Sequence, residues 1–248
     1  MVDGADASGW SDVADGWAQL WGSFADPVRV AIIEAAGIGA GTCVLDVGCG
    51  SGEFLVMLRS VGAEGVGVDP ASEMVRLARA SGSEVVHAGA DELPFPDASF
   101  DVATAINALQ FADDTTDALQ EMSRVVRSGG LIAIANWAEG ARNDIDVIER
   151  AVAEAREEEL GPDGPLRPAG GLEAALRAAG LDVVATGVVA VPWQAVDGET
   201  LVRGVLLGED DATMAELASA VVTAAAGFAD GRGGFVLHNA FRWAIARV

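Results

Sequence analysis

The 248-residue sequence contains no lysine and no tyrosine. Without lysine, the chain can form neither a Schiff base nor a pyridoxal-phosphate anchor, and it cannot supply the lysine of a P-loop. Without tyrosine, it lacks the phenolic acid–base group on which many short-chain reductases depend. Only His87 and His238 can titrate as imidazoles. These absences exclude several common kinds of active site.

Positive charge is also scarce. The sequence has 38 Asp and Glu residues and only 15 basic residues, all of them arginine, so the formal net charge is −23. Phosphate backbones are bound by clustered basic side chains, and the sequence shows no basic stripe. We therefore expect a solvated acidic surface and no nucleic-acid partner.

The chain has only two cysteines, Cys43 and Cys49. Two thiols in this arrangement predict neither a disulfide framework nor a four-ligand zinc site, and we expect no metal. No apolar run approaches the roughly 18 residues of a membrane span. The first residues, MVDGADASGWSDVADGW, are acidic and lack the apolar stretch of a signal peptide. The composition predicts a reduced, soluble, cytoplasmic protein without a membrane partner.

Short β-type runs alternate with helix-type segments between about residues 28 and 138. Alternation of this kind predicts an α/β fold, in which a parallel sheet is covered by helices on both faces. Gly129 and Gly130 are expected to stop the last of these helices. The predicted strands are 43–47, 65–69, 84–89, 100–106 and 131–137, and the predicted helices are 28–36, from 52, from about 72, and about 116–126.

The rest of the chain differs in pattern. Residues 143–160 look helical, 161–171 form a Gly/Pro break, and 171–179 form another helix. Residues 181–193 read as a strand, 197–228 as mostly helical, and the last 16 residues alternate like a strand. The interpretation divides the chain into an N-terminal helical lid (1–27), a ligand-binding core (28–138), cap helices (139–180) and C-terminal strands that complete the sheet (181–248), with a helical insert at 197–228.

The segment VLDVGCGSGEF, residues 44–54, places three glycines directly after a predicted strand. Gly48 and Gly50 match the first two positions of the dinucleotide fingerprint G-x-G-x-x-G, but Glu53 stands at the third. A glutamate at the start of a helix is unfavourable beside a pyrophosphate and favourable beside a cation. The loop therefore indicates a ligand that comes close to the backbone and carries no phosphate there.

The pattern D-x-G-x-G-x-G, from Asp46 to Gly52, resembles motif I of class I S-adenosylmethionine-dependent methyltransferases. Further segments match in order: GVGVDP, DPASEM, AGADELPFPDASFD and RVVRSGGLIAIANW. The resemblance covers residues 40–140 and extends loosely to the C-terminus. It implies a Rossmann-like, doubly wound, mostly parallel seven-stranded sheet with an added helical cap, and S-adenosylmethionine as cofactor.

The resemblance also implies roles for single residues. Asp69 would accept hydrogen bonds from both ribose hydroxyls, and Met74 would flank the adenine. Asp91 would accept from the adenine amino group, and the main chain of Asn107 would lie near the methionine part. The full set of expected cofactor-binding residues is Asp46, Gly48, Cys49, Gly50, Gly52, Asp69, Pro70, Met74, Ala90, Asp91, Glu92 and Asn107.

The residues after the fourth predicted strand narrow the range of possible substrates. Methylases of planar amino groups carry Asn/Asp-Pro-Pro-aromatic there, whereas this chain has Asn107, Ala108, Leu109 and Gln110. The stretch also lacks the cysteine nucleophile of nucleic-acid C5 methylases. Many quinone-type and sterol-type relatives have a histidine near Gln110, and this chain departs from that pattern. Three nearby acids (113, 114 and 117) admit two interpretations, a metal site or the capped start of a helix, and the capped helix start is favoured.

The expected substrate is a small, largely apolar molecule, methylated on oxygen, nitrogen or carbon, as in specialised metabolism. Trp17, Trp21, Gln110 and Trp137 are the candidate substrate contacts, and His238 is the candidate catalytic base, with a surface or packing histidine as its alternative. Trp17 and Trp21 share one face of a helix, so they could instead simply fill the core.

Two other kinds of function are compatible with the sequence. One is an NAD(P)-dependent oxidoreductase on a related sheet, against which Glu53 and the missing tyrosine count. The other is a non-catalytic protein that binds S-adenosylmethionine and partners an active enzyme, against which the intact acids at positions 46, 69 and 91 count.

Overall fold

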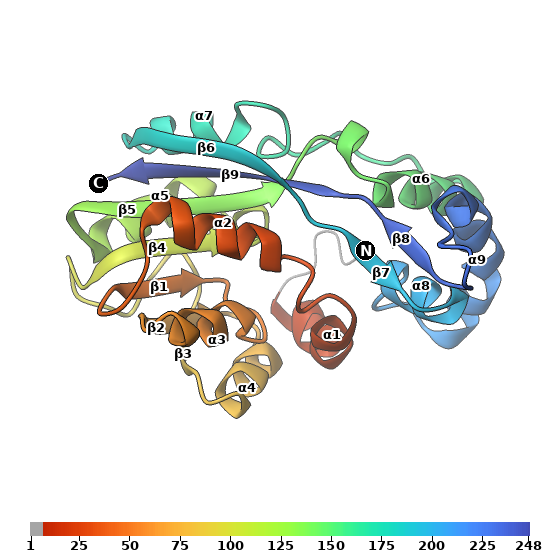
Figure 1. The fold of residues 1–248 in the computed structure, drawn as a ribbon, viewed down its shortest axis with the longest axis horizontal. Helices are drawn as coiled ribbons and strands as arrows, with labels where there is room; N and C mark the ends of the chain where they lie inside the picture. The colour runs from red at the N-terminus through yellow and green to blue at the C-terminus, as the bar shows by residue number, and fades with distance from the viewer. Residues whose placement is uncertain (1–6) are drawn as a thin grey trace.

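A seven-stranded sheet runs through the computed structural model, in which residues 7–248 are described (Figure 1). The strand order is β3-β2-β1-β4-β5-β9-β6. All neighbours up to β5 pair in parallel, and β9 is antiparallel to both β5 and β6. The predicted mostly parallel seven-stranded sheet is confirmed. Its strands are β1 (Cys43–Val47), β2 (Glu64–Asp69), β3 (Glu84–His87), β4 (Phe100–Ile106), β5 (Val126–Trp137), β6 (Asp182–Ala190) and β9 (Ala240–Arg247).

Helices cover both faces of this sheet because its inner strands are apolar on both sides. Val44 and Leu45, neighbours in β1, are both 0% exposed and belong to different core clusters. Side chains of successive strand residues point to opposite faces, so a run of aliphatic residues requires cover above and below. One face is covered by α2 (Asp26–Ala36), α3 (Glu53–Ser60) and α4 (Ser72–Ala80), and the other by α5 (Thr115–Val125) and α7 (Gly171–Ala178).

The start of α5 decides whether the acids at positions 113, 114 and 117 form a metal site or a helix cap. Asp114 is the N-cap, and its Oδ1 accepts hydrogen bonds from the main-chain N–H groups of Thr116 (2.6 Å) and Asp117 (3.2 Å). A carboxylate in this position satisfies free N–H groups at the positive end of the helix. The capping interpretation is therefore confirmed.

The expected stop of α5 at two glycines is wrong. The helix ends at Val125, and β5 begins at the next residue, Val126, which pairs with Phe100. Gly129 and Gly130 lie inside β5, where Gly129 has a φ of +82° and the register with β4 shifts. Strand pairing ends the helix, and the glycines form an irregularity within a longer strand.

A second group of elements lies beyond one end of the sheet (Figure 1). The expected strand 181–193 is divided, since β6 ends at Ala190 and the chain passes Pro192 into another sheet, and the expected helix 143–160 is shorter. The group comprises α6 (Ile145–Ala155), α8 (Gly198–Val205), α9 (Asp211–Ala224) and the two-stranded sheet of β7 (Trp193–Ala195) and β8 (Phe235–Leu237). Short 3-10 turns, η1 (Leu109–Phe111), η2 (Gly140–Arg142) and η3 (Ala225–Phe228), complete the structure.

The N-terminal helix α1 (Ala7–Leu20) joins the sheet to this second group. Trp21, directly after α1, is 1% exposed, stacks on Trp193 at 4.3 Å between ring centroids, and donates its indole N–H to the carbonyl of Gly204 (3.1 Å). Trp193 in turn donates to the carbonyl of Leu20 (2.7 Å). Two buried rings with satisfied N–H groups fix the end of α1 firmly. No helix in the described part of the chain is both long and apolar enough to cross a bilayer.

Candidate functional site

The site lies at the carboxyl ends of β1, β2 and β4, where the strand order reverses direction along the chain. Open α/β sheets bind ligands at this position because the loops diverge there and leave a crevice. The loop after β1 is built by three left-handed glycines, with φ of +69° at Gly48, +54° at Gly50 and +92° at Gly52. Residues with a Cβ rarely adopt such angles, so the glycine spacing produces the loop shape.

The three glycines serve different purposes. A Cβ on Gly48 would lie 2.4 Å from Cβ of Ala108, and one on Gly52 would lie 2.9 Å from Cβ of Ala78. Both glycines therefore allow close packing between elements. A Cβ on Gly50 would meet nothing within 4 Å. Gly50 is the position where the loop presents bare backbone to open space.

Asp69, the last residue of β2, holds this loop in place. Its Oδ2 accepts a hydrogen bond from the N–H of Gly50, and its Oδ1 accepts one from the N–H of Ala71, both at 2.9 Å. The side chain lines the cavity although the residue is only 7% exposed, and burial raises its pKa despite these two bonds. Each carboxylate oxygen keeps a further lone pair for a ligand hydroxyl.

Asp46, in β1 just before the loop, bonds to the neighbouring strand β4. It is buried, its Oδ1 accepts from the hydroxyl of Thr104 at 2.7 Å, and it does not line the cavity. Burial raises its pKa to about 7, against the lowering effect of the Thr104 bond and of Arg29. Negative charge on Asp69 and Glu53 raises it further. The structure places Asp46 outside the cavity lining, away from the ligand contact expected for it.

Arg29 and Glu53 form a charged end of the same cavity. Arg29, in α2, donates to the carbonyl of Gly22 and to Asp26, both at 2.7 Å, while its Nε is buried without an acceptor. Glu53, in the first turn of α3, accepts from Ser51 at 2.5 Å. Arg29 cannot be selected from the sequence, because nothing in its own helix distinguishes it from the other arginines.

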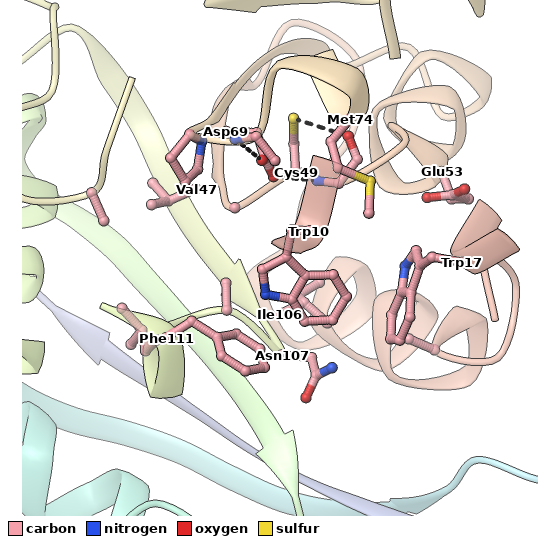
Figure 2. A pocket seen from close by; sticks show the side chains of 18 of the residues that line it. Trp10, Trp17, Val47, Cys49, Glu53, Asp69, Met74, Ile106, Asn107 and Phe111 are labelled. Carbon is pink, nitrogen blue, oxygen red and sulfur yellow. Dashed lines mark hydrogen bonds between the residues drawn. The ribbon is translucent and has the colours of Figure 1, made fainter. Parts of the chain in front are cut away.

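We call this space the glycine-loop cavity (Figure 2). Of the expected cofactor residues, eight line it and four do not. Asp46 is buried and bonded to Thr104, Gly52 lies against Ala78, and Asp91 and Glu92 are exposed outside the lining. The expected residues that line it are Gly48, Cys49, Gly50, Asp69, Pro70, Met74, Ala90 and Asn107, joined by Trp10, Trp17, Phe24, Arg29, Glu53, Ile106 and Phe111, among others.

A second space, the tryptophan cavity, adjoins the first and encloses about 930 Å³. Trp10, Trp17, Asn107 and Phe111 line both spaces. Three of these four side chains are aromatic, and the centroids of the Trp10 and Phe111 rings are 5.1 Å apart. The further lining of the tryptophan cavity includes Trp21, Gln110, Thr115, Asn136, Trp137, Glu139, Asp146, Glu149, Arg150 and residues 160–167.

All four expected substrate residues, Trp17, Trp21, Gln110 and Trp137, line the tryptophan cavity. Trp10 was missed, although it stands seven residues before Trp17 and so shares its helical face. His238 lines neither cavity. It is exposed, and its main chain exchanges hydrogen bonds with Asp144 through N–H to Oδ2 (2.7 Å) and C=O to N–H (3.1 Å). The structure therefore separates His238 from the site.

Asn107 occupies a strained position between the two cavities. Its φ is +58°, its N–H donates to the carbonyl of Ala135 at 2.8 Å, and its Oδ1 accepts from Nε2 of Gln110 at 2.8 Å. Asparagine tolerates the left-handed region better than most residues, and such outliers concentrate at ligand sites.

The glycine-loop cavity matches one kind of ligand well. Asp69 offers acceptors, Arg29 and Glu53 offer one charge of each sign, and the cavity has no lysine and no second cation among its described lining residues. Such a set fits a ligand with ribose hydroxyls and a zwitterionic end better than one with a pyrophosphate.

Comparison with known proteins agrees with this assignment. Residues 45–134 match a family model described as "Methyltransferase domain". The chain is 40% identical over 106 residues to an O-methyltransferase of Aspergillus sclerotiorum, covering 39% of this chain and 40% of that protein. It is 36% identical over 111 residues to a malonyl-[acyl-carrier protein] O-methyltransferase of Pseudescherichia vulneris, covering 44% of each. The match thus spans less than half the length of these curated relatives.

Among solved structures, the fold is similar to that of an S-adenosylmethionine-dependent methyltransferase from Aquifex aeolicus. The TM-score is 0.55 with 17% sequence identity, and the alignment covers 98% of this chain and all of the other. At this identity the similarity concerns the fold. The sequence match at 45–134 contains the glycine loop, Asp69 and both ends of β4.

Proposed function

We propose that this chain, which carries a methyltransferase domain of the class I S-adenosylmethionine-dependent type, transfers a methyl group to a small, largely apolar molecule. One observation carries the proposal. The glycine-loop cavity and the tryptophan cavity share a boundary of Trp10, Trp17, Asn107 and Phe111, so ligands in the two spaces would meet there. The named relatives act on oxygen, which supports a biosynthetic O-methylation.

In this proposal the cofactor, when bound, supplies an electrophilic methyl group on a sulfonium centre. Asp69 accepts the ribose hydroxyls with the lone pairs that its two main-chain bonds leave free. Met74, buried in the cavity wall, packs against the adenine. Gly50 lets the amino-acid end lie on the backbone, where Arg29 and Glu53 match its carboxylate and ammonium groups.

The boundary residues align the reacting groups and exclude water. Methyl transfer is an in-line displacement in which charge is dispersed, so correct alignment in a dry site provides much of the rate. The aromatic rings of Trp10, Trp17 and Phe111 supply apolar walls, and Asn107 supplies the polar group between them.

Calorimetric titration tests the cofactor assignment. S-adenosylmethionine should bind the full chain in preference to NAD, and Asp69→Ala should weaken binding by about 1–3 kcal/mol, because two hydroxyls lose a charged acceptor. Asp182→Ala is the matched control, since Asp182 is an exposed carboxylate at the amino end of β6.

Three outcomes distinguish the candidate functions. Preferential binding of NAD would favour the oxidoreductase. Binding of S-adenosylmethionine without transfer to any acceptor would favour the non-catalytic binding protein. Unchanged affinity in Asp69→Ala would remove Asp69 from the site.

A further inference from the structure

His87 is one of only two histidines in the chain and is the last residue of β3. In the register of the sheet its Cα partner on β2 is Asp69, which accepts the ribose hydroxyls in the proposed function. Registered residues of parallel strands point to the same face of a sheet. The exposed ring is not among the described residues that line either cavity, so His87 can act on the cofactor only through its neighbours.

The ring of His87 is bonded to the residue that follows Asp69. Its Nε2 lies 2.7 Å from the main-chain carbonyl oxygen of Pro70. A carbonyl oxygen can only accept, so Nε2 carries a hydrogen and donates it, in the neutral ring and in the protonated ring alike. The main-chain N–H of Ala88 donates to the carbonyl of Asp69 at 3.2 Å. Two consecutive carbonyls, of residues 69 and 70, are thus held by two consecutive residues, 87 and 88.

The carbonyl that His87 holds belongs to the same peptide unit as a donor to Asp69. The C=O of Pro70 and the N–H of Ala71 are the two ends of one planar group. That N–H donates to Oδ1 of Asp69 at 2.9 Å, while His87 donates to the C=O end. A bond at the carbonyl end fixes the plane of the peptide and polarises its N–H, which strengthens the bond that the N–H makes. His87, the 70–71 peptide and the carboxylate therefore form a continuous chain of hydrogen bonds.

The Asp69 carboxylate depends on this chain for its charge and for its orientation. Burial raises the pKa of Asp69, whereas the bonds from the N–H groups of Ala71 and Gly50, and the charge of His87, lower it. Each carboxylate oxygen uses one lone pair for a main-chain N–H, so the directions of the remaining lone pairs are set by those two N–H groups. A rotation of the 70–71 peptide would therefore turn the acceptors that face the ribose.

Strand β3 is held in the sheet by bonds that do not involve the ring. It pairs with β2 along residues 84–87, and Arg79 in α4 donates from Nε and Nη2 to the carbonyl of Val85 at 3.0 and 2.8 Å. The ring itself is exposed, and substitutions of exposed side chains usually change stability little. Loss of the ring should therefore leave β3 in place and act mainly on the 70–71 peptide.

We propose that His87 is a positioning residue for the cofactor, because it holds the carbonyl end of the 70–71 peptide and so aims the N–H end at the carboxylate that binds ribose. This inference rests on the proposed function. His87 contributes no atom to the contact with the cofactor, and its effect should pass through Asp69. If the ring only fastens β3 to the turn, its loss should change stability without changing cofactor affinity.

The test compares variants of the full chain at pH 8, with calorimetry for the binding of S-adenosylmethionine and chemical denaturation for stability. His87→Gln keeps a side-chain N–H that can replace Nε2 as the donor. His87→Leu removes the donor at similar volume, and His87→Ser, which is too short to reach Pro70, replaces it if the leucine variant does not fold. His238→Leu is the matched control, since His238 is also exposed and lies outside the lining of both cavities. Each His87 variant is also made in the Asp69→Ala background.

His87→Leu should weaken the binding of S-adenosylmethionine about 3- to 10-fold, whereas His87→Gln and His238→Leu should bind within about 2-fold of the wild type. In the Asp69→Ala background the leucine change should cause no further loss, because its effect passes through the missing carboxylate. Unchanged affinity in folded His87→Leu would overturn the inference. So would an equal loss in His87→Gln, or a loss of the same size with and without Asp69. Failure of the wild type to bind S-adenosylmethionine would instead reject the proposed function.

Discussion

Nη2 of Arg29 lies 3.9 Å from Oε2 of Glu53 at one end of the glycine-loop cavity. The two residues come from α2 and α3, and both are largely buried there. A carboxylate and a guanidinium held side by side present opposite charges to the same ligand. The amino-acid end of S-adenosylmethionine has the complementary pair, an ammonium and a carboxylate, and the buried Nε of Arg29 has no acceptor of its own.

Replacing Arg29 should weaken binding of the amino-acid end of the cofactor and leave binding of its nucleoside end unchanged. Arg29→Met should weaken the binding of S-adenosylmethionine by about 1–3 kcal/mol, because the carboxylate of the cofactor loses a charge-assisted hydrogen bond. The affinity for 5′-methylthioadenosine, which has no amino-acid end, should stay the same. Arg59→Met, at a more exposed arginine bonded to Ser81 and Ser83, is the control. An equal loss for both ligands would mean that Arg29 only supports the fold.

Two alanine substitutions in the glycine loop should have different effects. Gly50→Ala should lower cofactor affinity while costing only about 1–2 kcal/mol of stability, because its φ is +54° but nothing lies within 4 Å of the new Cβ. Gly48→Ala should cost more stability, since its Cβ would lie 2.4 Å from that of Ala108. Chemical denaturation measures stability, and calorimetry measures binding. Equal stability of the two variants would contradict this assignment.

The buried carboxyl of Asp46 should make stability fall as pH rises. Its pKa of about 7 in the folded protein lies above the ordinary value of 3.8, so between these values the folded state binds the extra proton. Asp46→Asn keeps an acceptor for Thr104 and removes the charge. The variant should match wild type near pH 4 and exceed it above pH 7, by at most about 4 kcal/mol. Thermal melts across this range measure the difference, and parallel curves would show that Asp46 does not titrate there.

The two N-terminal tryptophans should differ in their roles. Trp21 is in the core, so Trp21→Ala should lower the free energy of unfolding by about 3–5 kcal/mol. Trp17 is half-buried and lines both cavities, so Trp17→Ala should cost less stability and impair acceptor binding more.

Hydrogen exchange tests the prediction that residues 1–27 form a lid. Hydrogen exchange over residues 10–25 should slow when S-adenosylhomocysteine and an acceptor are bound, since the α1 face then gains a partner. The bonds from Trp21 to Gly204 and from Trp193 to Leu20 predict that any opening moves the first turns of α1 and leaves its end in place. Equal protection with and without ligands would show a permanent wall.

Local sequence signals predicted the parts of the site that a strand and its following loop create. CVLDV and FDVATAI match β1 and β4 residue for residue, and Asp69 follows from its place at the end of β2. Arg29 could not be selected in this way, because its place in the glycine-loop cavity depends on neighbours distant in sequence. The error at Gly129 has the same origin, since pairing with Phe100 overrides the local helix stop.

The position of β9 in the sheet constrains when the newly made chain can finish folding. The last strand, Ala240–Arg247, lies between β5 and β6 and pairs with both, and Val248 exchanges main-chain hydrogen bonds with Gly129 and Gly130. Until β9 has left the ribosome, β5 has an open edge and β6 has no partner in the sheet. The nascent chain can therefore complete its sheet only after β9 has emerged, and until then an exposed strand edge is available to chaperones or to misassembly.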